Sequence, residues 1–141
     1  MERSPIVIDA SVVVKWFVEE EFSREARLMR DSYVNRLIDL AAPSLMPYEV
    51  LNALKYSGAF GEDELKDLAI ALDDYQIELY ELKGDIALKA IEIAMRKGVT
   101  IYDAAYIALA QHLRSILYTA DERLIRKIGG NYVRHTSQFR V

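Results

Sequence analysis

The chain has 141 residues, a formal net charge of −4 at pH 7 and no cysteine, which excludes disulfides, thiolate metal ligands and cysteine nucleophiles. Its 52% of hydrophobic residues suffice for a core, and its 28% of charged residues argue against a disordered or membrane-embedded chain. Since no uncharged run approaches the roughly 18–20 residues that span a bilayer, we expect a cytoplasmic protein with no membrane partner, forming a single domain over residues 1–141.

Apolar runs and turn residues predict an alternation of strands and helices. In chain order we expect a strand at 5–9, helices at 11–18 and from 23, a strand at 40–42, helices at 44–57 and 61–75, a strand at 77–82, helices at 84–97 and 100–113, a strand with its turn at 115–121, a helix at 122–128, and an edge strand at 131–136. Pro47 is tolerated only in the first turn of its helix, so that helix begins near Ser44 or Met46. Ser11 and Ser23 are expected N-caps, and Gly58 and Gly98 are expected stops.

This alternation predicts an α/β fold with three layers, in which helices cover both faces of a central, mainly parallel sheet. The segment 100–113 is apolar on nearly every side, which indicates a buried central helix. In such sheets ligands bind beyond the carboxyl ends of the strands. Asp9 and Asp121 each follow a predicted strand, so both are expected at that edge.

Four carboxylates stand in apolar or tightly turned surroundings, unlike the acids in polar runs. They are Asp9 in "VIDAS", Glu49 in "PYEVLNAL", Asp103 in "TIYDAAYIALA" and Asp121 in "YTADERL". Each also has a structural interpretation. Asp9 and Asp121 would cap the helices that follow them, Thr100 and Asp103 resemble a capping box, and Glu49 suits a helix N-terminus.

Taken together, the four carboxylates favour a metal site. If they converge at one sheet edge, their repulsion forces some of them to protonate unless a cation compensates their charge. Oxygen ligands without cysteine or histidine suit Mg²⁺ or Mn²⁺. We therefore expect a divalent cation to stabilise Asp9.

The order of these motifs resembles the PIN domain, and most closely the VapC-type toxins of toxin–antitoxin pairs. The resemblance covers essentially the whole chain and is carried by "VIDASVVVKW" at 7–16, "PYEVLNAL" at 47–54, "YDAAYIALA" at 102–110 and "TAD" at 119–121. It implies a compact PIN-like fold and a metal-dependent endoribonuclease whose acidic quartet is Asp9, Glu49, Asp103 and Asp121. It also implies supporting roles for Ser11, Asn52 and Thr119. Arg123 stands where some members of the family carry a further acid.

The resemblance and the chemistry of phosphodiester hydrolysis together suggest roles for the quartet. Asp9 and Asp103 would be the main ligands of one or two Mg²⁺ or Mn²⁺ ions, and Asp121 a direct or water-mediated ligand. Glu49 would be a ligand or would orient the attacking water. VapC-type proteins are typically homodimers blocked by a small antitoxin, so the implied partners are RNA, a cognate VapB-like antitoxin and a second copy of the chain.

Basic and aromatic residues near the motifs have weaker interpretations. Residues 111–141 carry six basic and two acidic side chains, a bias that suits either phosphate contact or an ordinary solvated face. Residues proposed to hold the RNA backbone are Arg114, Arg123, Arg126, Lys127, Arg134 and, close to Asp9, Lys15. The tyrosines at 48, 102 and 106 are interpreted as core residues, and His112 and His135 as structural or surface residues.

Three alternatives to the toxin nuclease remain open from the sequence. A phosphoryl-accepting receiver domain also gathers acids at a sheet edge, but no lysine follows the strand at 116–119 as that class requires. A housekeeping RNA-processing PIN nuclease would act without an antitoxin. A non-catalytic PIN-fold binding module would use the acids only structurally and would not bind divalent ions.

Overall fold

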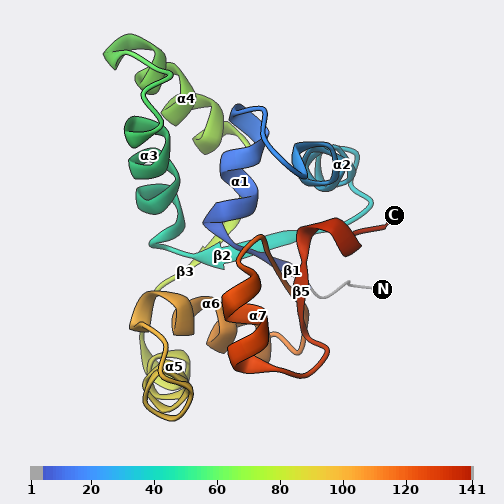
Figure 1. Cartoon of the computed structure of the whole chain (residues 1–141), viewed down its shortest axis with the longest axis vertical. Coiled ribbons are helices and arrows are strands. Elements are labelled where there is room, and N and C mark those ends of the chain that lie inside the picture. The colour runs from blue at the N-terminus through green and yellow to red at the C-terminus, as the bar shows by residue number, and fades with distance from the viewer. Residues whose placement is uncertain (1–4, 141) are drawn as a thin grey trace.

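The computed structural model describes residues 5–140, in which helices alternate with strands as the sequence predicts (Figure 1). The strands are β1 (Ile6–Ile8), β2 (Leu40–Pro43), β3 (Glu78–Tyr80), β4 (Leu117–Thr119) and β5 (Val133–His135). The helices are α1 (Ala10–Phe17), α2 (Ser23–Val34), α3 (Met46–Tyr56), α4 (Glu62–Asp74), α5 (Gly84–Lys97), α6 (Ile101–His112) and α7 (Glu122–Ile128), followed by a 3-10 turn, Thr136–Gln138. No helix within residues 5–140 is long and apolar enough to cross a membrane.

The five strands form one parallel sheet in the order β3-β2-β1-β4-β5. At its centre, Val7 of β1 pairs with Ala41 of β2 on one side and with Leu117 of β4 on the other. Helices α1 to α4 cover one face of the sheet and α5 to α7 the other (Figure 1). The predicted three-layer α/β/α class is therefore confirmed, and all carboxyl ends of the strands meet at one edge.

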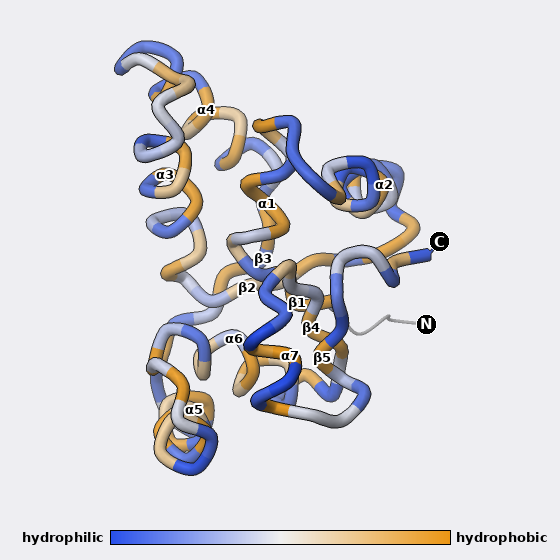
Figure 2. The backbone as a smooth tube through the Cα atoms, viewed as in Figure 1, coloured by the Kyte–Doolittle hydropathy of each residue, from blue (hydrophilic) through white to orange (hydrophobic). Residues whose placement is uncertain are grey.

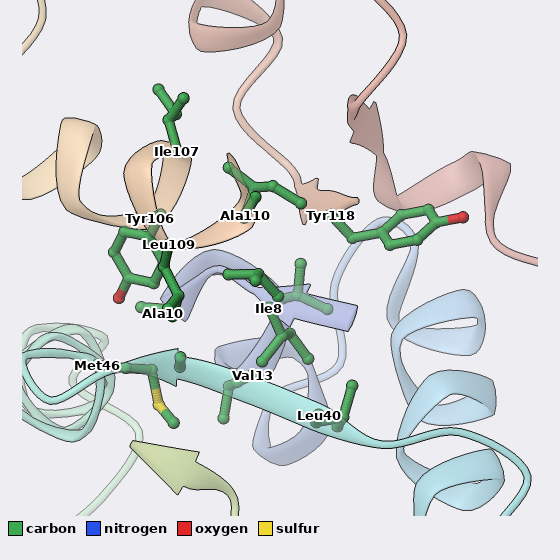
Figure 3. Packing of buried hydrophobic residues seen from close by; sticks show 14 of the residues in the cluster. Ile8, Ala10, Val13, Leu40, Met46, Tyr106, Ile107, Leu109, Ala110 and Tyr118 are labelled. Atoms are coloured by element: carbon green, nitrogen blue, oxygen red, sulfur yellow. The ribbon is translucent and has the colours of Figure 1, made fainter. Parts of the chain in front are cut away.

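The core lies on both faces of the sheet, and α6 is its most deeply buried helix. Val7 and Ile8 have no exposed surface, and every residue of 104–110 is buried (Figure 3). In Figure 2 the central strands β1 and β2 are largely hydrophobic, whereas the segment between α1 and α2 is hydrophilic. A helix that is apolar on all sides must be enclosed, because leaving one side in water would forfeit the free energy of burying it.

Several helix ends follow the predicted signals. Helix α3 begins at Met46 with Pro47 in its first turn, as expected. Gly98 ends α5 in the left-handed conformation, with a φ of 65° that a residue without a Cβ adopts most readily. The strand predicted at 77–82 is shorter in the structure, Glu78–Tyr80, and lies at the edge of the sheet.

The two predicted serine caps are wrong. Asp9 occupies the N-cap position of α1, and Ser11 lies inside the first turn. Ser23 is the first residue of α2, and Phe22 precedes it in a left-handed conformation. The Ser23 hydroxyl instead closes the preceding loop, accepting from the Glu20 N–H and donating to the Val18 carbonyl.

Candidate functional site

The candidate site lies where β1 and β4 end side by side. These neighbouring strands mark the point at which the strand order reverses direction, because β2 and β3 extend the sheet on one side and β4 and β5 on the other. Such a switch point leaves a crevice beyond the strand ends, which is the common ligand position in parallel sheets. Asp9 directly follows β1, and Thr119 is the last residue of β4.

Two hydroxyl groups hold the Asp9 carboxylate. Ser11 Oγ and Thr119 Oγ1 each donate to Asp9 Oδ2 at 2.7 Å. Both hydroxyls also accept a backbone N–H at 3.0 Å, Ser11 from Ala120 and Thr119 from Asp121. Because an N–H can only donate, each hydroxyl proton is left to point at Asp9, an arrangement that favours the ionised carboxylate.

Asp9 therefore does more than its structural interpretation as a helix cap requires. It occupies the N-cap position of α1 without a side-chain capping hydrogen bond, although the Ala10 N–H at the start of α1 lowers its pKa. Its partners come from Ser11, two residues on, and from Thr119 at the far end of the chain. Ser11 and Thr119, predicted as supporting residues, lie directly against Asp9.

Glu49 lies in the first turn of α3 and is tied to α6. Its Oε1 accepts a 2.7 Å hydrogen bond from the hydroxyl of Tyr106, a residue with only 2% of its surface exposed. In Figure 3 the Tyr106 ring sits among the core residues near Ala10. Sequence reasoning correctly interpreted Tyr106 as a core residue but missed its contact with Glu49. The available signal was its position three residues after Asp103, which places both on one face of α6.

Asp103 lies in the first turn of α6, and Asp121 is the N-cap of α7. The Asp103 N–H donates to Thr100 Oγ1 at 3.0 Å, as the capping motif predicts. Asp121 Oδ1 accepts from the N–H groups of Arg123 and Leu124, so its capping role is confirmed. The cap occupies Oδ1, and the predicted role of Asp121 at a metal rests on its second oxygen.

Electrostatic coupling links carboxylates from separate elements. The pKa values of Asp9, Glu49 and Asp103 are all raised, in each case chiefly by burial. Repulsion adds to this effect: Asp103 raises the pKa of Asp9, both raise that of Glu49, and Asp121 raises that of Asp103. Asp9, Glu49 and Asp103 are therefore electrostatically coupled, and Asp121 is linked to them through Asp103, so that a cation placed among them would relieve their repulsion.

Hydrogen bonds and two cations oppose these shifts. Ser11 and Thr119 lower the pKa of Asp9, and Tyr106 lowers that of Glu49. Arg123 and Lys127 of α7 lower the pKa of Asp103, which places their charges beside the site. These are two of the basic residues proposed to contact RNA.

The predicted phosphate contact by Lys15 is wrong. Lys15 is only 7% exposed, and its Nζ donates to Glu20 Oε1 at 3.0 Å and to the Glu21 carbonyl at 2.7 Å. Its ammonium group therefore holds the end of α1 against the loop that leads to α2. Arg134 Nε donates to the Asn131 carbonyl at 2.9 Å, and its predicted contact with RNA stays a prediction.

A cleft of about 870 Å³ adjoins Glu49 between α3 and the start of α6. It is lined by Ser44, Leu45, Tyr48, Glu49, Asn52, Glu81 and Tyr102. Asn52 thus lies beside Glu49, as expected. Tyr48 and Tyr102 are 78% and 64% exposed, so their interpretation as core residues is wrong. Each sits next in sequence to a candidate carboxylate, on the solvent side of its helix.

Comparison with known proteins places the chain in a family. A sequence profile of the PIN domain matches residues 6–130, a range that contains all four candidate carboxylates. The chain belongs to the PIN-domain family. This PIN domain is also 34% identical over 130 residues to Ribonuclease VapC3 of Pyrobaculum aerophilum, in an alignment that covers 86% of this chain and 93% of that protein.

Solved structures share the fold of this PIN domain. A chain of a toxin–antitoxin complex from Klebsiella pneumoniae matches with a TM-score of 0.71 and 18% identity, over 93% of this chain and 97% of that one. A chain of the DNA-bound VapBC structure from Salmonella typhimurium matches with a TM-score of 0.64 and 17% identity, over 95% and 99%. At these identities the likeness concerns the fold alone.

Proposed function

We propose that this PIN domain is a divalent-cation-dependent endoribonuclease that hydrolyses RNA phosphodiester bonds, and that it is the toxin of a VapBC-type toxin–antitoxin pair. The observation that supports the proposal is that Asp9 at the switch point of the sheet, Glu49 of α3 and Asp103 of α6 come from three elements and lie close enough for their charges to interact. The relationship to Ribonuclease VapC3 supports RNA as the substrate.

The donor set fits Mg²⁺ or Mn²⁺. Asp9, Asp103, Asp121 and Glu49 would hold one or two such ions through carboxylate oxygens, the ligands that hard cations prefer. Within residues 5–140, no three His, Asp or Glu side chains are spaced to bind one ion together as they stand. Mg²⁺ needs no such cage, because it keeps several waters and binds through one or two carboxylates.

A bound divalent ion lowers the pKa of its water and neutralises charge on the phosphoryl group. The chain's own residues do the rest of the work. Ser11 and Thr119 keep Asp9 oriented and favour its ionised form against the effect of burial, and Glu49 would hold the attacking water or the ion. Arg123 and Lys127 bring positive charge to the α7 side of the site, where it would attract the phosphates of RNA.

The cleft beside Glu49 is where we place the RNA bases next to the scissile phosphate. The exposed faces of Tyr48 and Tyr102 suit stacking on unpaired bases, and the Asn52 amide suits hydrogen bonding to base edges. Glu81 lines the same cleft and disfavours phosphate there, which assigns the bases to the cleft and the backbone to α7.

The remaining partners follow from the family. The matched chains come from toxin–antitoxin complexes, which supports a cognate VapB-like antitoxin as the partner that blocks the site. We also propose a homodimer, supported by an apolar stripe of exposed residues on the outer face of α5, which consists of Leu88, Ile91 and Met95. We place the protein in the cytoplasm, because its proposed RNA substrate would be present in that compartment.

The test is cleavage of a mixed RNA panel with Mg²⁺, Mn²⁺ or EDTA. We expect cleavage with either ion, none with EDTA, and none in Asp9→Asn, because that change removes a charged ligand. Asp67→Asn, at an exposed position on α4, is the matched control and should cleave like the wild type.

Each other outcome has a defined meaning. Equal cleavage by Asp9→Asn would contradict the metal-site assignment. Absence of both cleavage and divalent-ion binding in the wild type would favour the binding module. If the wild-type protein cleaves RNA but has no cognate antitoxin, the housekeeping nuclease would be favoured.

A further inference from the structure

Tyr106 joins two parts of the site that are 57 residues apart in the chain. Its ring is packed in the core on α6, one turn after Asp103, and its hydroxyl donates to Glu49 Oε1 at 2.7 Å. Within residues 5–140 this is the one hydrogen bond made by the Glu49 side chain, and it occupies one of the two carboxylate oxygens.

The tyrosine hydroxyl is suited to act as a permanent donor. The ordinary pKa of a phenol is about 10, so at neutral pH the Tyr106 hydroxyl keeps the proton that it donates to Glu49. The ring cannot turn away, because a side chain 2% exposed is enclosed by close-packed neighbours. A fixed donor and a partly buried acceptor give the Glu49 carboxylate one orientation.

We propose that Tyr106 is a positioning residue that fixes the Glu49 carboxylate through Oε1, so that Oε2 is the oxygen that Glu49 presents to the site. The inference rests on the proposed nuclease function. It favours a single-oxygen contact of Glu49 with an ion or with the attacking water over a bidentate one, because Oε1 already accepts a hydrogen bond. Groups that orient ligands in this way typically affect metal affinity or activity by about 10- to 100-fold when they are removed.

The main test is Tyr106→Phe, which removes one oxygen atom and keeps the buried ring. Mg²⁺ affinity is measured by titration calorimetry on the free protein, and kcat and KM on one RNA substrate. We expect Mg²⁺ affinity or kcat to fall about 10- to 100-fold, with KM for RNA unchanged. Tyr118→Phe is the matched control, because Tyr118 is a buried tyrosine, 5% exposed, whose ring packs on Phe139. It should behave like the wild type.

A double-mutant cycle separates positioning from packing. If Tyr106 acts only through Glu49, then Tyr106→Phe has no further effect on kcat in a Glu49→Gln background. Equal losses in both backgrounds would show that the tyrosine acts through packing and would overturn the inference. Denaturant unfolding of each variant accompanies the cycle, so that a loss of folded protein is counted separately.

The outcomes also separate this inference from the proposed function. A Tyr106→Phe variant with wild-type Mg²⁺ affinity and kcat would overturn the positioning role and leave the nuclease intact. A wild-type protein that neither binds Mg²⁺ nor cleaves RNA would overturn the proposed function, and the positioning role with it.

Discussion

Asp9 is held by two hydroxyl groups whose own protons are directed by the backbone of the turn between β4 and α7. Thr119 is the more enclosed of the two, because it is fully buried whereas Ser11 is half-buried. The single oxygen atom Thr119 Oγ1 decides whether the Asp9 carboxylate and the Asp121 N–H both have a hydrogen-bond partner there. The site is therefore sensitive to changes that leave the side-chain volume unaltered.

Replacing Thr119 by valine should destabilise the protein by about 1–3 kcal/mol, because two half-buried partners, Asp9 and the Asp121 N–H, lose their hydrogen bond. The free energy of unfolding in urea measures the effect. Thr136→Val is the matched control: Thr136 is equally buried, yet its Oγ1 has no hydrogen-bond partner within residues 5–140. That change should be neutral or stabilising. Equal destabilisation in both variants would contradict the role given to the Thr119 hydroxyl.

Among the elements, α5 is unusual because it is apolar on two opposite faces. Ala90 and Ile93 are buried against the rest of the fold, whereas Leu88, Ile91 and Met95 are 66%, 52% and 80% exposed. The exposed three are spaced by three and four residues, so they form a continuous stripe along the helix. Such a stripe on a surface helix marks an interaction site, which is why we place the proposed homodimer contact there.

The double substitution Leu88→Glu with Met95→Glu should convert the dimer to a monomer, because it places two like charges in the centre of the contact. Sedimentation gives the mass of the particle in solution. Ile70→Glu, at a 62% exposed position on α4, should remain dimeric. A dimeric double variant would exclude α5 as the interface, and a monomeric wild type would contradict the homodimer.

At the scale of the whole molecule, the site exists only because distant segments share one sheet. β1 pairs directly with β4, so the first and last motifs meet across more than 100 residues of chain. This interleaving is why we propose that residues 1–141 form a single domain. Bringing several carboxylates into one partly buried place also opposes folding. Their pKa values are raised in the folded state, so their ionised forms, which dominate at neutral pH in the unfolded chain, are less stable in the folded protein.

The sign of this effect makes a pH prediction. The pKa of Asp103 is raised above its ordinary 3.8, so the stability linked to its proton is present below that value and is lost as pH rises through the folded-state pKa. Asp103→Asn should therefore have a higher Tm than the wild type at neutral pH in EDTA. The difference should vanish as pH falls toward 4. A lower Tm for Asp103→Asn at neutral pH in EDTA would contradict the electrostatic account.

Thermal melts with added Mg²⁺ extend the same comparison. A cation that binds the folded wild type raises its Tm, and loss of a ligand in Asp103→Asn weakens that response. The gap between the two proteins should therefore narrow. Asp67→Asn should track the wild type under every condition.

The sequence by itself determined the features that depend on neighbours within a few residues. Pro47 set the start of α3, Gly98 the end of α5, and Thr100 the start of α6, because helix ends are decided by local hydrogen bonds and backbone preferences. The alternation of apolar runs predicted the parallel sheet, and the positions of Asp9 after β1 and Asp121 after β4 follow from the same pattern. The four candidate carboxylates are identifiable from the sequence alone, and their role at a metal stays a prediction.

Only the tertiary structure decided what each side chain faces. The pairing of Tyr106 with Glu49, the attachment of Thr119 to Asp9, and the burial of Lys15 against the loop after α1 all depend on packing between separate elements. The sequence did not predict the exposure of Tyr48 and Tyr102. An aromatic residue on a helix is usually interpreted as a core residue, and only the positions of the neighbouring helices show whether its side chain is covered. Local sequence sets the backbone of each element, whereas the contacts of a side chain depend on residues that are far away in the chain.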